Sequence, residues 1–463
     1  MSVNVNPAQS PEPLPIARAA QERGAPHGLK RRMRRWLHDH LVPGGVGPFA
    51  GHLRGWLASL VAYGVLFLAY TLTLLTAAFG RLVPHRRWRP TGRIMVTGTF
   101  HNPGWYLSHV VPLTRCGMEE VILVVDEPQA PLEHVRFVCP PRWIAKVLSR
   151  AVAKALWMVV AGLRFRPDLY IGYHILPGAC SALIAARLLG RPACYQMTAG
   201  PVEIIGGGFH AQTRITRNLA QPSASLERLA MAVVRQFELV VVRGSKARTF
   251  LSERGLNGTV AVITGSVNSR LATNGHRPLG LAFVGRLEED KQPVQFVEIT
   301  AAVRRTFPEV RAVMLGAGSL MDAVRRRADE LGVADCIDIL GKRNDVEAFL
   351  VTSKVFVLTS RSEGLSIAMA EAMAAGAVPV VANVGELGDL VKDGVNGFLV
   401  EPNNLEQYAD RIVALLSDAN LWQRCSAAAR ESAARACSVN IVSRLWQHHL
   451  EEVVDHAARA PAT

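Results

Sequence analysis

Short apolar runs alternate with helical patterns from residue 91 onward. The runs are continuous rather than alternating, which is typical of strands buried on both faces of a parallel sheet. In the first half of the chain they lie at residues 93–98, 121–126, 169–174, 193–197 and 239–245. Segments with helical periodicity, such as residues 181–190, lie between several of them. The alternation predicts a doubly wound α/β domain, Rossmann-like in plan, over residues 91–270.

The pattern pauses at residues 266–280, which are polar and rich in turn residues, as interdomain linkers are. Apolar runs then return at residues 281–285, 310–316, 336–341, 355–360, 378–383 and 397–402. We therefore predict a second Rossmann-like domain over residues 278–430, followed by a C-terminal helix and tail at residues 431–463. The two domains are expected to face a crevice at the carboxyl ends of their strands, where open α/β sheets bind ligands.

The N-terminal 90 residues have a different composition. Residues 1–29 are rich in Pro, Ala, Ser and Gln, which predicts a disordered tail. Residues 30–90 enclose an uncharged apolar run at about residues 55–80, which as a helix would exceed the roughly 30 Å hydrocarbon thickness of a bilayer. We predict a membrane helix, with a buried core helix as the alternative. Basic residues flank both ends, so the positive-inside rule leaves a spanning helix and a monotopic insertion both open.

The charge is concentrated in that N-terminal part. The chain has a net charge of +14, and residues 1–93 hold 13 Lys and Arg against 3 Asp and Glu. A nucleic-acid enzyme more often spreads its positive charge along a groove, so we expect no nucleic-acid partner. The seven cysteines include no pair at C-x-x-C spacing, which favours reduced thiols over a disulfide framework or a zinc site.

A second membrane-directed pattern lies within the first domain. Four cations recur every four residues beside apolar positions: Arg142, Lys146, Arg150 and Lys154. Such spacing predicts a basic amphipathic helix that binds anionic lipids. A solvated face on an ordinary domain helix is the alternative.

The segment RSEGLSIAMAEAMAAG, residues 361–376, predicts a binding site. Ser366 is a suitable N-cap and Gly376 a suitable stop for a helix that is apolar on nearly every side, apart from Glu371. A buried carboxylate needs a polar partner or a cleft. Since the first amides of a helix favour anions, a phosphate there, with hydroxyls at Glu363 and Glu371, would suit a sugar nucleotide.

These residues resemble a known family. The pattern S-x-x-E-G-x-S followed by A-E-A-M-A-x-G-x-x-P-V-V, which begins at Ser360, is similar to the E-x7-E signature of family-four retaining glycosyltransferases, which have the GT-B fold. The similarity continues in FVGRLEEDK at residues 283–291 and in GELGDLVKDGVNGFLVEPNN at residues 385–404. In the first domain, RPDLYIGYH at residues 166–174 is similar to the segment that ends in the family's active-site histidine.

The resemblance implies a role for each matching residue. Arg286 and Lys291 are expected to hold the donor diphosphate and stabilise the charge that develops on it. The resemblance further implies that Glu363 binds hydroxyls of the transferred sugar, Glu371 binds the ribose, and His174 lies beside the donor sugar. Further donor contacts are expected at Gly285, Gly364, Leu365 and Ser366, and at Asn102, Pro103 and Gly104, where the family usually has glycines. Gln292 also replaces a usual glycine. No metal and no cofactor are expected.

We therefore expect a membrane-associated retaining GT-B glycosyltransferase on the cytoplasmic side. Its donor would be a nucleotide-diphosphate sugar, and its acceptor a lipid-linked or growing polysaccharide. One alternative is a glycosyltransferase with a soluble acceptor. Another is a non-catalytic, membrane-bound scaffold, against which the presence of all four charged motif residues argues.

Overall fold

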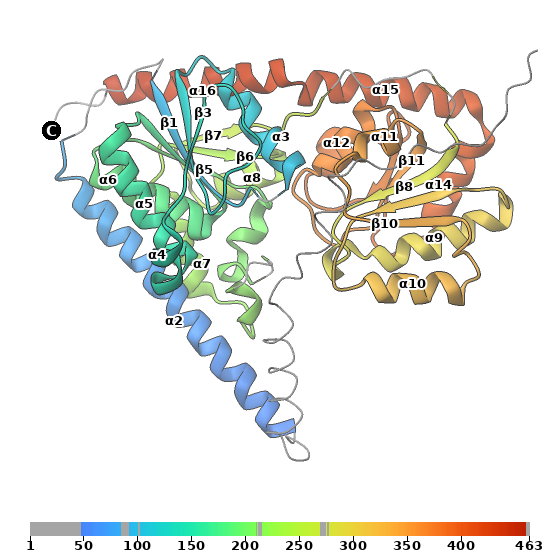
Figure 1. The fold of residues 1–463 in the computed structure, drawn as a ribbon, viewed down its shortest axis with the longest axis horizontal. Coiled ribbons are helices and arrows are strands. Elements are labelled where there is room, and N and C mark those ends of the chain that lie inside the picture. The colour runs from blue at the N-terminus through green and yellow to red at the C-terminus, as the bar shows by residue number, and fades with distance from the viewer. Residues whose placement is uncertain are drawn as a thin grey trace, which may run out of the picture. The chain divides into compact units, whose positions relative to one another are not determined.

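Two parallel β-sheets form the framework of the chain (Figure 1). The computed structural model describes residues 48–84, 92–100, 102–209, 211, 215–268, 275 and 277–459. The tail predicted at residues 1–29 and most of the basic residues predicted to flank the apolar run lie outside these ranges. Both sheets belong to one compact unit, Val61–Thr463.

The first sheet has seven parallel strands in the order β3-β2-β1-β4-β5-β6-β7. The five predicted strands are confirmed, and the sequence pattern misses only the two edge strands, β3 and β7. The side chains of β3 are at least partly exposed, so this strand lacks a continuous apolar run. The bounds are β1 Arg93–Thr97, β2 Glu120–Val124, β3 Val135–Val138, β4 Leu169–Tyr173, β5 Ala193–Gln196, β6 Leu239–Val242 and β7 Thr259–Val262.

Helices cover both faces of this sheet, because successive strand residues point to opposite sides. Met95 of β1 lies in one core cluster, and its neighbours Ile94 and Val96 lie in another. The α-helices are α3 Pro103–Thr114, α4 Arg142–Leu148, α5 Arg150–Phe165, α6 Cys180–Leu188, α7 Ala224–Val234 and α8 Ser245–Glu253. Short helical turns are η1 His174–Ala179, η2 Gly200–Glu203, η3 Ile205–Gly207 and η4 Thr216–Asn218.

The second sheet has six parallel strands in the order β10-β9-β8-β11-β12-β13, and all six are predicted by the sequence. The strands are β8 Leu279–Val284, β9 Ala312–Leu315, β10 Ile337–Gly341, β11 Ser353–Leu358, β12 Val378–Ala382 and β13 Phe398–Val400. The helices are η5 Glu289–Lys291, α9 Pro293–Thr306, α10 Met321–Glu330, α11 Val346–Leu350, α12 Ile367–Ala374, α13 Leu387–Leu390, α14 Leu405–Ser417 and α15 Ala419–Cys437. Two Rossmann-like domains therefore follow each other, as predicted.

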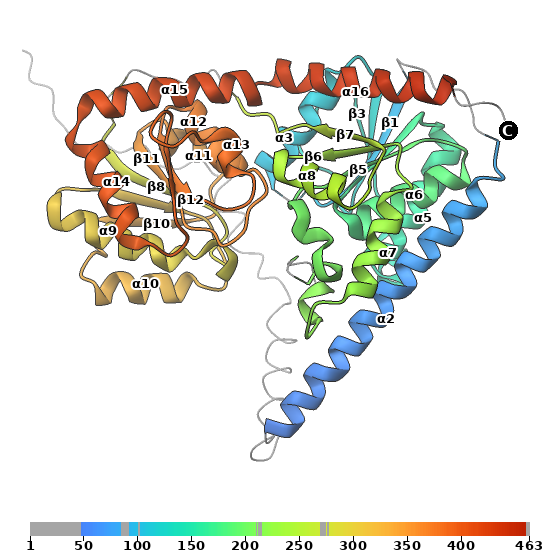
Figure 2. The same ribbon diagram turned by 180° about the vertical axis from the view of Figure 1, so that it is seen from behind.

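The chain then returns to the first domain (Figure 2). Helix α16, Val439–Arg459, buries Val442, Trp446, Leu450 and Val453 in the same core cluster as residues of β1 and α3. The boundary predicted at residue 430 falls inside α15, so the predicted C-terminal helix consists of the end of α15 and all of α16. The first domain is therefore completed by the last helix of the described chain.

The predicted apolar segment forms one long helix, α2 Pro48–Gly80. Its stretch Trp56–Gly80 has a mean hydropathy of 1.9 and is long and apolar enough to cross a membrane. From Val61 onward the helix also packs on the first domain, because Ala62, Leu66 and Tyr70 belong to that domain's core. One helix therefore has both a membrane-like composition and a protein-facing side.

The predicted basic amphipathic helix is not continuous. Ser149 has a φ of 75° and separates α4 from α5, so the four cations do not form one ladder. Arg142, Lys146 and Arg150 are exposed. The membrane role predicted for Lys154 is wrong: its side chain is buried, and its Nζ lies 3.0 Å from Oδ2 of Asp126. A lysine stem can reach such an internal partner, which its spacing in the sequence does not reveal.

Candidate functional site

The loop after β11 holds the central ion pair of the second domain. Lys291 Nζ lies 2.6 Å from Oε1 of Glu363, and both side chains are largely buried. The hydroxyl of Ser360 donates to the same carboxylate at 2.7 Å. A buried pair of this kind is held by a hydrogen bond as well as by charge. The structure therefore brings together two residues predicted to act at the donor.

Arg286 lies on the loop between β8 and η5, and its side chain is more exposed than that of Lys291. Its guanidinium is half-exposed and is 2.6 Å from Asp290. Gln292 has a left-handed conformation, with a φ of 46°. Glycine adopts that conformation without steric cost, whereas Gln292 adopts it with a side chain. The loop thus presents Arg286 to solvent and Lys291 to Glu363.

Helix α12 begins as predicted. Ser366 is its N-cap and accepts a hydrogen bond from the amide of Met369 at 3.3 Å. The predicted stop is also present, since Gly376 has a φ of 81°. Leu365 is buried in the core beside this helix, so only its backbone can face a ligand.

Glu371 of α12 has no hydrogen-bond partner among the described residues. Burial, followed by the nearby Glu347, raises its pKa to about 7. A Cβ added at Gly104 of the first domain would lie 3.5 Å from Oε1 of Glu371, so this carboxylate points across to the start of α3. An unpartnered carboxylate between two domains is suited to accept hydrogen bonds from hydroxyl groups.

The loop at Asn102–Gly104 lies at the start of α3, close to Glu371 of the second domain. Asn102 is the N-cap of α3, and its Oδ1 accepts a hydrogen bond from the amide of Trp105 at 3.2 Å. Pro103 occupies the first turn, which suits proline because that amide has no helical partner. Asn102 is therefore engaged by its own helix, and Gly104 provides the close approach to the second domain.

His174 follows β4 directly, as predicted, and its ring is one-third exposed. Its Nδ1 lies 2.7 Å from Oγ1 of Thr198 and 3.3 Å from Oε1 of Glu203. Burial alone would raise the pKa of Glu203, but the charge and hydrogen bond of His174, together with other donors, hold it below its usual value. Glu203 therefore fixes the orientation of the histidine.

The same network reaches the second domain. Glu203 accepts hydrogen bonds from the amides of Thr198 and Ala199 at 2.8 and 2.7 Å. A Cβ added at Gly364 would lie 2.5 Å from the backbone oxygen of Thr198. The close approach of Thr198 leaves no room for a side chain at residue 364, so the loop after β5, which also contacts His174, touches the Glu363 loop.

A buried polar cluster beside this contact is missed by the sequence reasoning. Arg243 is 3% exposed, and its Nε and Nη2 have no partner within the described part of the chain. Burial lowers its pKa to about 10, while Cys437, Glu363 and Tyr173 oppose the decrease. Its guanidinium lies over the ring of Trp105, 5.5 Å from the centroid. The sequence VVRGS, at the end of β6, could have indicated this residue, since it places an arginine at a strand's carboxyl end.

Two carboxylates of the second domain also bind the first domain. Glu386 accepts the amides of Lys246 and Ala247 at 3.0 and 2.7 Å, and Asp389 accepts the hydroxyl of Ser245 at 2.6 Å. These groups occupy the start of α8, where amides favour anions. The contact fixes one edge of the interface between the two domains.

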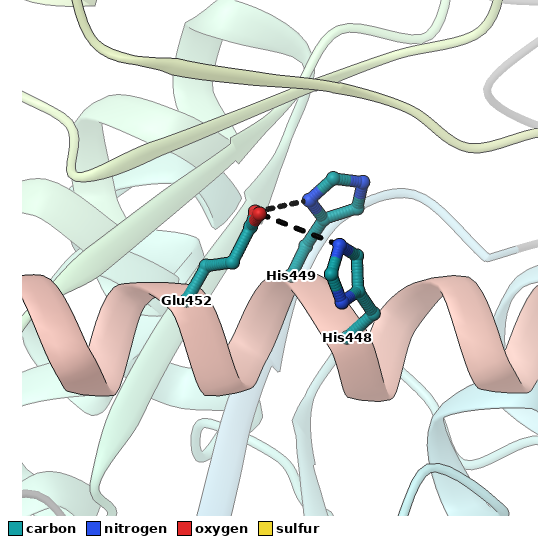
Figure 3. A group of neighbouring side chains, drawn as sticks. All are labelled: His448, His449 and Glu452. Carbon is teal, nitrogen blue, oxygen red and sulfur yellow. Dashed lines mark hydrogen bonds and ion pairs between the residues drawn. The ribbon is translucent and has the colours of Figure 1, made fainter.

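One group of possible metal ligands occurs among the described residues, on α16 (Figure 3). The Glu452 carboxylate lies between His448 and His449, at 3.3 and 2.7 Å. None of the predicted site residues belongs to this group. The contacts are side-chain pairs at i,i+3 and i,i+4 on one helix.

Comparisons with known proteins agree with the two-domain fold. Residues 273–432 match the family model described as glycosyl transferases group 1. A UDP-Gal:alpha-D-GlcNAc-diphosphoundecaprenol alpha-1,3-galactosyltransferase of Escherichia coli is 32% identical over 138 residues, which cover 29% of this chain and 36% of the relative. A D-inositol 3-phosphate glycosyltransferase of Nocardiopsis dassonvillei is 27% identical over 326 residues, covering 64% and 71%.

Among solved structures, HepE of Anabaena in complex with UDP-glucose has a TM-score of 0.62 at 18% identity, covering 79% of this chain and 100% of that one. The chain spans 24% to 40% of the length of the first three curated relatives. The likeness to HepE shows the fold. The chain therefore has the two-domain GT-B architecture, and its second domain is similar to group 1 glycosyl transferases.

Proposed function

We propose that this protein is a retaining glycosyltransferase that uses a nucleotide-diphosphate sugar. The observation that carries the proposal is the Lys291–Glu363 pair, 2.6 Å apart, within the segment that matches the family model. Gly364, next in the chain, touches Thr198, which bonds His174. Transfer of a sugar from a nucleotide diphosphate needs a cation for the leaving diphosphate and a carboxylate that binds the sugar, both at one crevice. Arg286 and Lys291 stabilise the leaving diphosphate, and Glu371 binds the ribose.

The reaction proceeds on one face of the sugar. The bond between the anomeric carbon and the phosphate oxygen breaks, and its electron pair stays on the leaving diphosphate. The acceptor oxygen bonds to the anomeric carbon, and its proton passes to the leaving phosphate. No separate general base is required, which suits a crevice where His174 is already held by Thr198 and Glu203.

The acceptor we propose is lipid-linked or a growing polysaccharide, at the cytoplasmic face of a membrane. The Escherichia coli relative is named for a diphosphoundecaprenol acceptor, and α2 is apolar enough to hold the protein at a bilayer. Anchoring would raise the local concentration of such an acceptor.

The test is donor hydrolysis in the absence of acceptor. Purified protein is incubated with UDP-, GDP- and ADP-sugars, and we expect slow release of one nucleotide. Lys291→Ala should reduce the rate about 10²- to 10³-fold, as loss of a transition-state donor does. Arg305→Ala, at an exposed residue on α9, is the control and should leave the rate unchanged. Binding of a sugar nucleotide with no turnover on any acceptor would favour the scaffold instead.

A further inference from the structure

The part of helix α2 from Ala62 to Gly80 is bound to the first domain. Five of its residues that are at most 4% exposed recur at helical spacing on one side: Ala62, Leu66, Tyr70, Thr73 and Ala77. Tyr63 bonds Ser225 through their hydroxyls at 2.8 Å. Near the other end, a Cβ added at Gly80 would lie 2.6 Å from Cβ of Arg187.

This docking conflicts with a free transmembrane span. Residues 62–80 extend over about 27 Å of helix, nearly the roughly 30 Å of a bilayer core. If that stretch crossed the membrane while docked, the first domain would enter the hydrocarbon together with charged groups such as Arg187. Burial of charge there is costly. If α2 instead separated from the domain in order to span the membrane, the five buried side chains and their partners in the core would become exposed.

The opposite side of α2 is apolar and exposed. Its large side chains are 45% to 66% exposed and repeat at intervals of four and three residues: Val61, Val65, Leu68, Leu72, Leu75 and Phe79. Leu82, just after the helix, is 79% exposed. A continuous apolar stripe of this length marks an interaction surface. The sequence contains no Asp or Glu between residues 41 and 118, so no carboxylate of α2 opposes contact with anionic lipid.

Helices α4 and α5 extend this surface. Val83 and Pro84, just after α2, line the same pocket as Leu163 at the end of α5. Exposed apolar side chains continue along α4 and α5: Trp143, Val147, Leu148, Val152, Leu156, Val160 and Leu163. The exposed cations Arg142, Lys146 and Arg150 accompany them, and residues 134–167 include no Asp or Glu.

The exposed cations indicate what binds this apolar surface. A second copy of the chain would bring these cations against cations, which is unfavourable. An anionic leaflet supplies hydrocarbon for the apolar stripe and phosphate for the cations. We propose that α2 lies in one leaflet, parallel to the membrane surface, and that α4 and α5 bind anionic headgroups beside it. This inference rests on the membrane association in the proposed function and specifies its geometry. Both ends of α2 then lie on the same side of the membrane as the crevice.

The first test is membrane topology in cells. In a Cys139→Ser background, Ser10→Cys reports the side of the N-terminal segment, and Val395→Cys, at an exposed residue, reports the second domain. We expect an impermeant maleimide to label both only after permeabilisation. Labelling of Ser10→Cys alone in intact cells would establish a spanning helix and overturn the proposal.

The second test is binding to vesicles. The triple variant Arg142→Ala, Lys146→Ala, Arg150→Ala should bind phosphatidylglycerol vesicles about fivefold more weakly per cation removed. Arg305→Ala, Arg311→Ala, Arg343→Ala removes three exposed cations from the second domain and should bind normally. Equal binding by both triples would overturn the headgroup role.

These tests are independent of catalysis. Donor hydrolysis in detergent should be unchanged in the first triple variant, because none of its residues lies in the crevice. A protein that hydrolyses donor but spans the membrane contradicts only this inference. A protein that lies in one leaflet but never turns over a donor contradicts only the proposed enzyme function.

Discussion

Glu203 should be the most sensitive carboxylate of the first domain. We consider Glu203→Gln, which keeps the size of the side chain and removes its charge. The carboxylate is fully buried, and both of its oxygens are occupied. Oε1 accepts the amides of Thr198 and Ala199, and Oε2 accepts the amide of Ile175 at 2.9 Å and the hydroxyl of Tyr195 at 2.8 Å.

The magnitude follows from these contacts. The new NH2 group can face the Tyr195 hydroxyl, which can accept, but it then leaves the Ile175 amide without an acceptor. An unsatisfied buried amide costs about 1–3 kcal/mol, and the remaining hydrogen bonds lose the strength that a charged acceptor gives them. We expect Glu203→Gln to lower the free energy of unfolding by about 3 kcal/mol at pH 7.

The assay is urea unfolding followed by tryptophan fluorescence. Glu227→Gln is the matched control, since Glu227 is partly exposed and accepts one amide, from Gly206, and Nε of Arg254. We expect it to cost about 1 kcal/mol. The pKa of Glu203 is lowered in the folded protein, so its stabilisation is present above the ordinary carboxyl pKa and is lost as pH falls through the folded value.

Two results would refute this reasoning. One is a Glu203→Gln variant no less stable than Glu227→Gln at pH 7. The other is a difference between Glu203→Gln and the unmodified protein that stays the same as the pH is lowered through the acid range. Either result would mean that the network does not depend on a charged acceptor.

Three further predictions concern the crevice. The pKa of Glu371 rises from 4.5 to about 7 on folding, so the protein should lose up to about 3 kcal/mol of stability as pH rises across that interval. In thermal unfolding, Glu371→Gln should remove this pH dependence of stability. An unchanged pH dependence in the variant would contradict the assignment. Hydroxyl donors favour the ionised form, so donor binding measured by calorimetry should strengthen as pH rises through 7 and depend less on pH in Glu371→Gln. Gly364→Ala would place a Cβ 2.5 Å from the oxygen of Thr198 and should lower both the melting temperature and donor hydrolysis, whereas Gly258→Ala, whose nearest contact is 3.8 Å, should do neither.

The sequence predicts the elements that depend on local patterns. Continuous apolar runs identify the central strands, and Ser366 and Gly376 mark the ends of α12, because capping depends on nearby residues. The edge strand β3 is missed because its side chains are only partly buried. The break at Ser149 is missed because no glycine or proline signals it.

Long-range contacts are the part that periodicity cannot predict. Lys154 matches the spacing of a surface cation but pairs with Asp126, 28 residues earlier. Glu203 lies in a short turn with no motif, and its importance comes from donors on two segments, at Ile175 and at residues 195–199. Arg243 likewise becomes notable only when the domains enclose it. In each case the decisive partner is distant in sequence.

The return of α16 to the first domain has a consequence for biosynthesis. Trp446 and Leu450 are synthesised after the whole second domain, yet they fill the core against β1 and α3. The nascent first domain therefore keeps an apolar groove open until α16 has been synthesised. A truncation before Val439 would release a chain whose earliest-made sheet stays uncovered on one side, and such a product should be a substrate for chaperones and proteases.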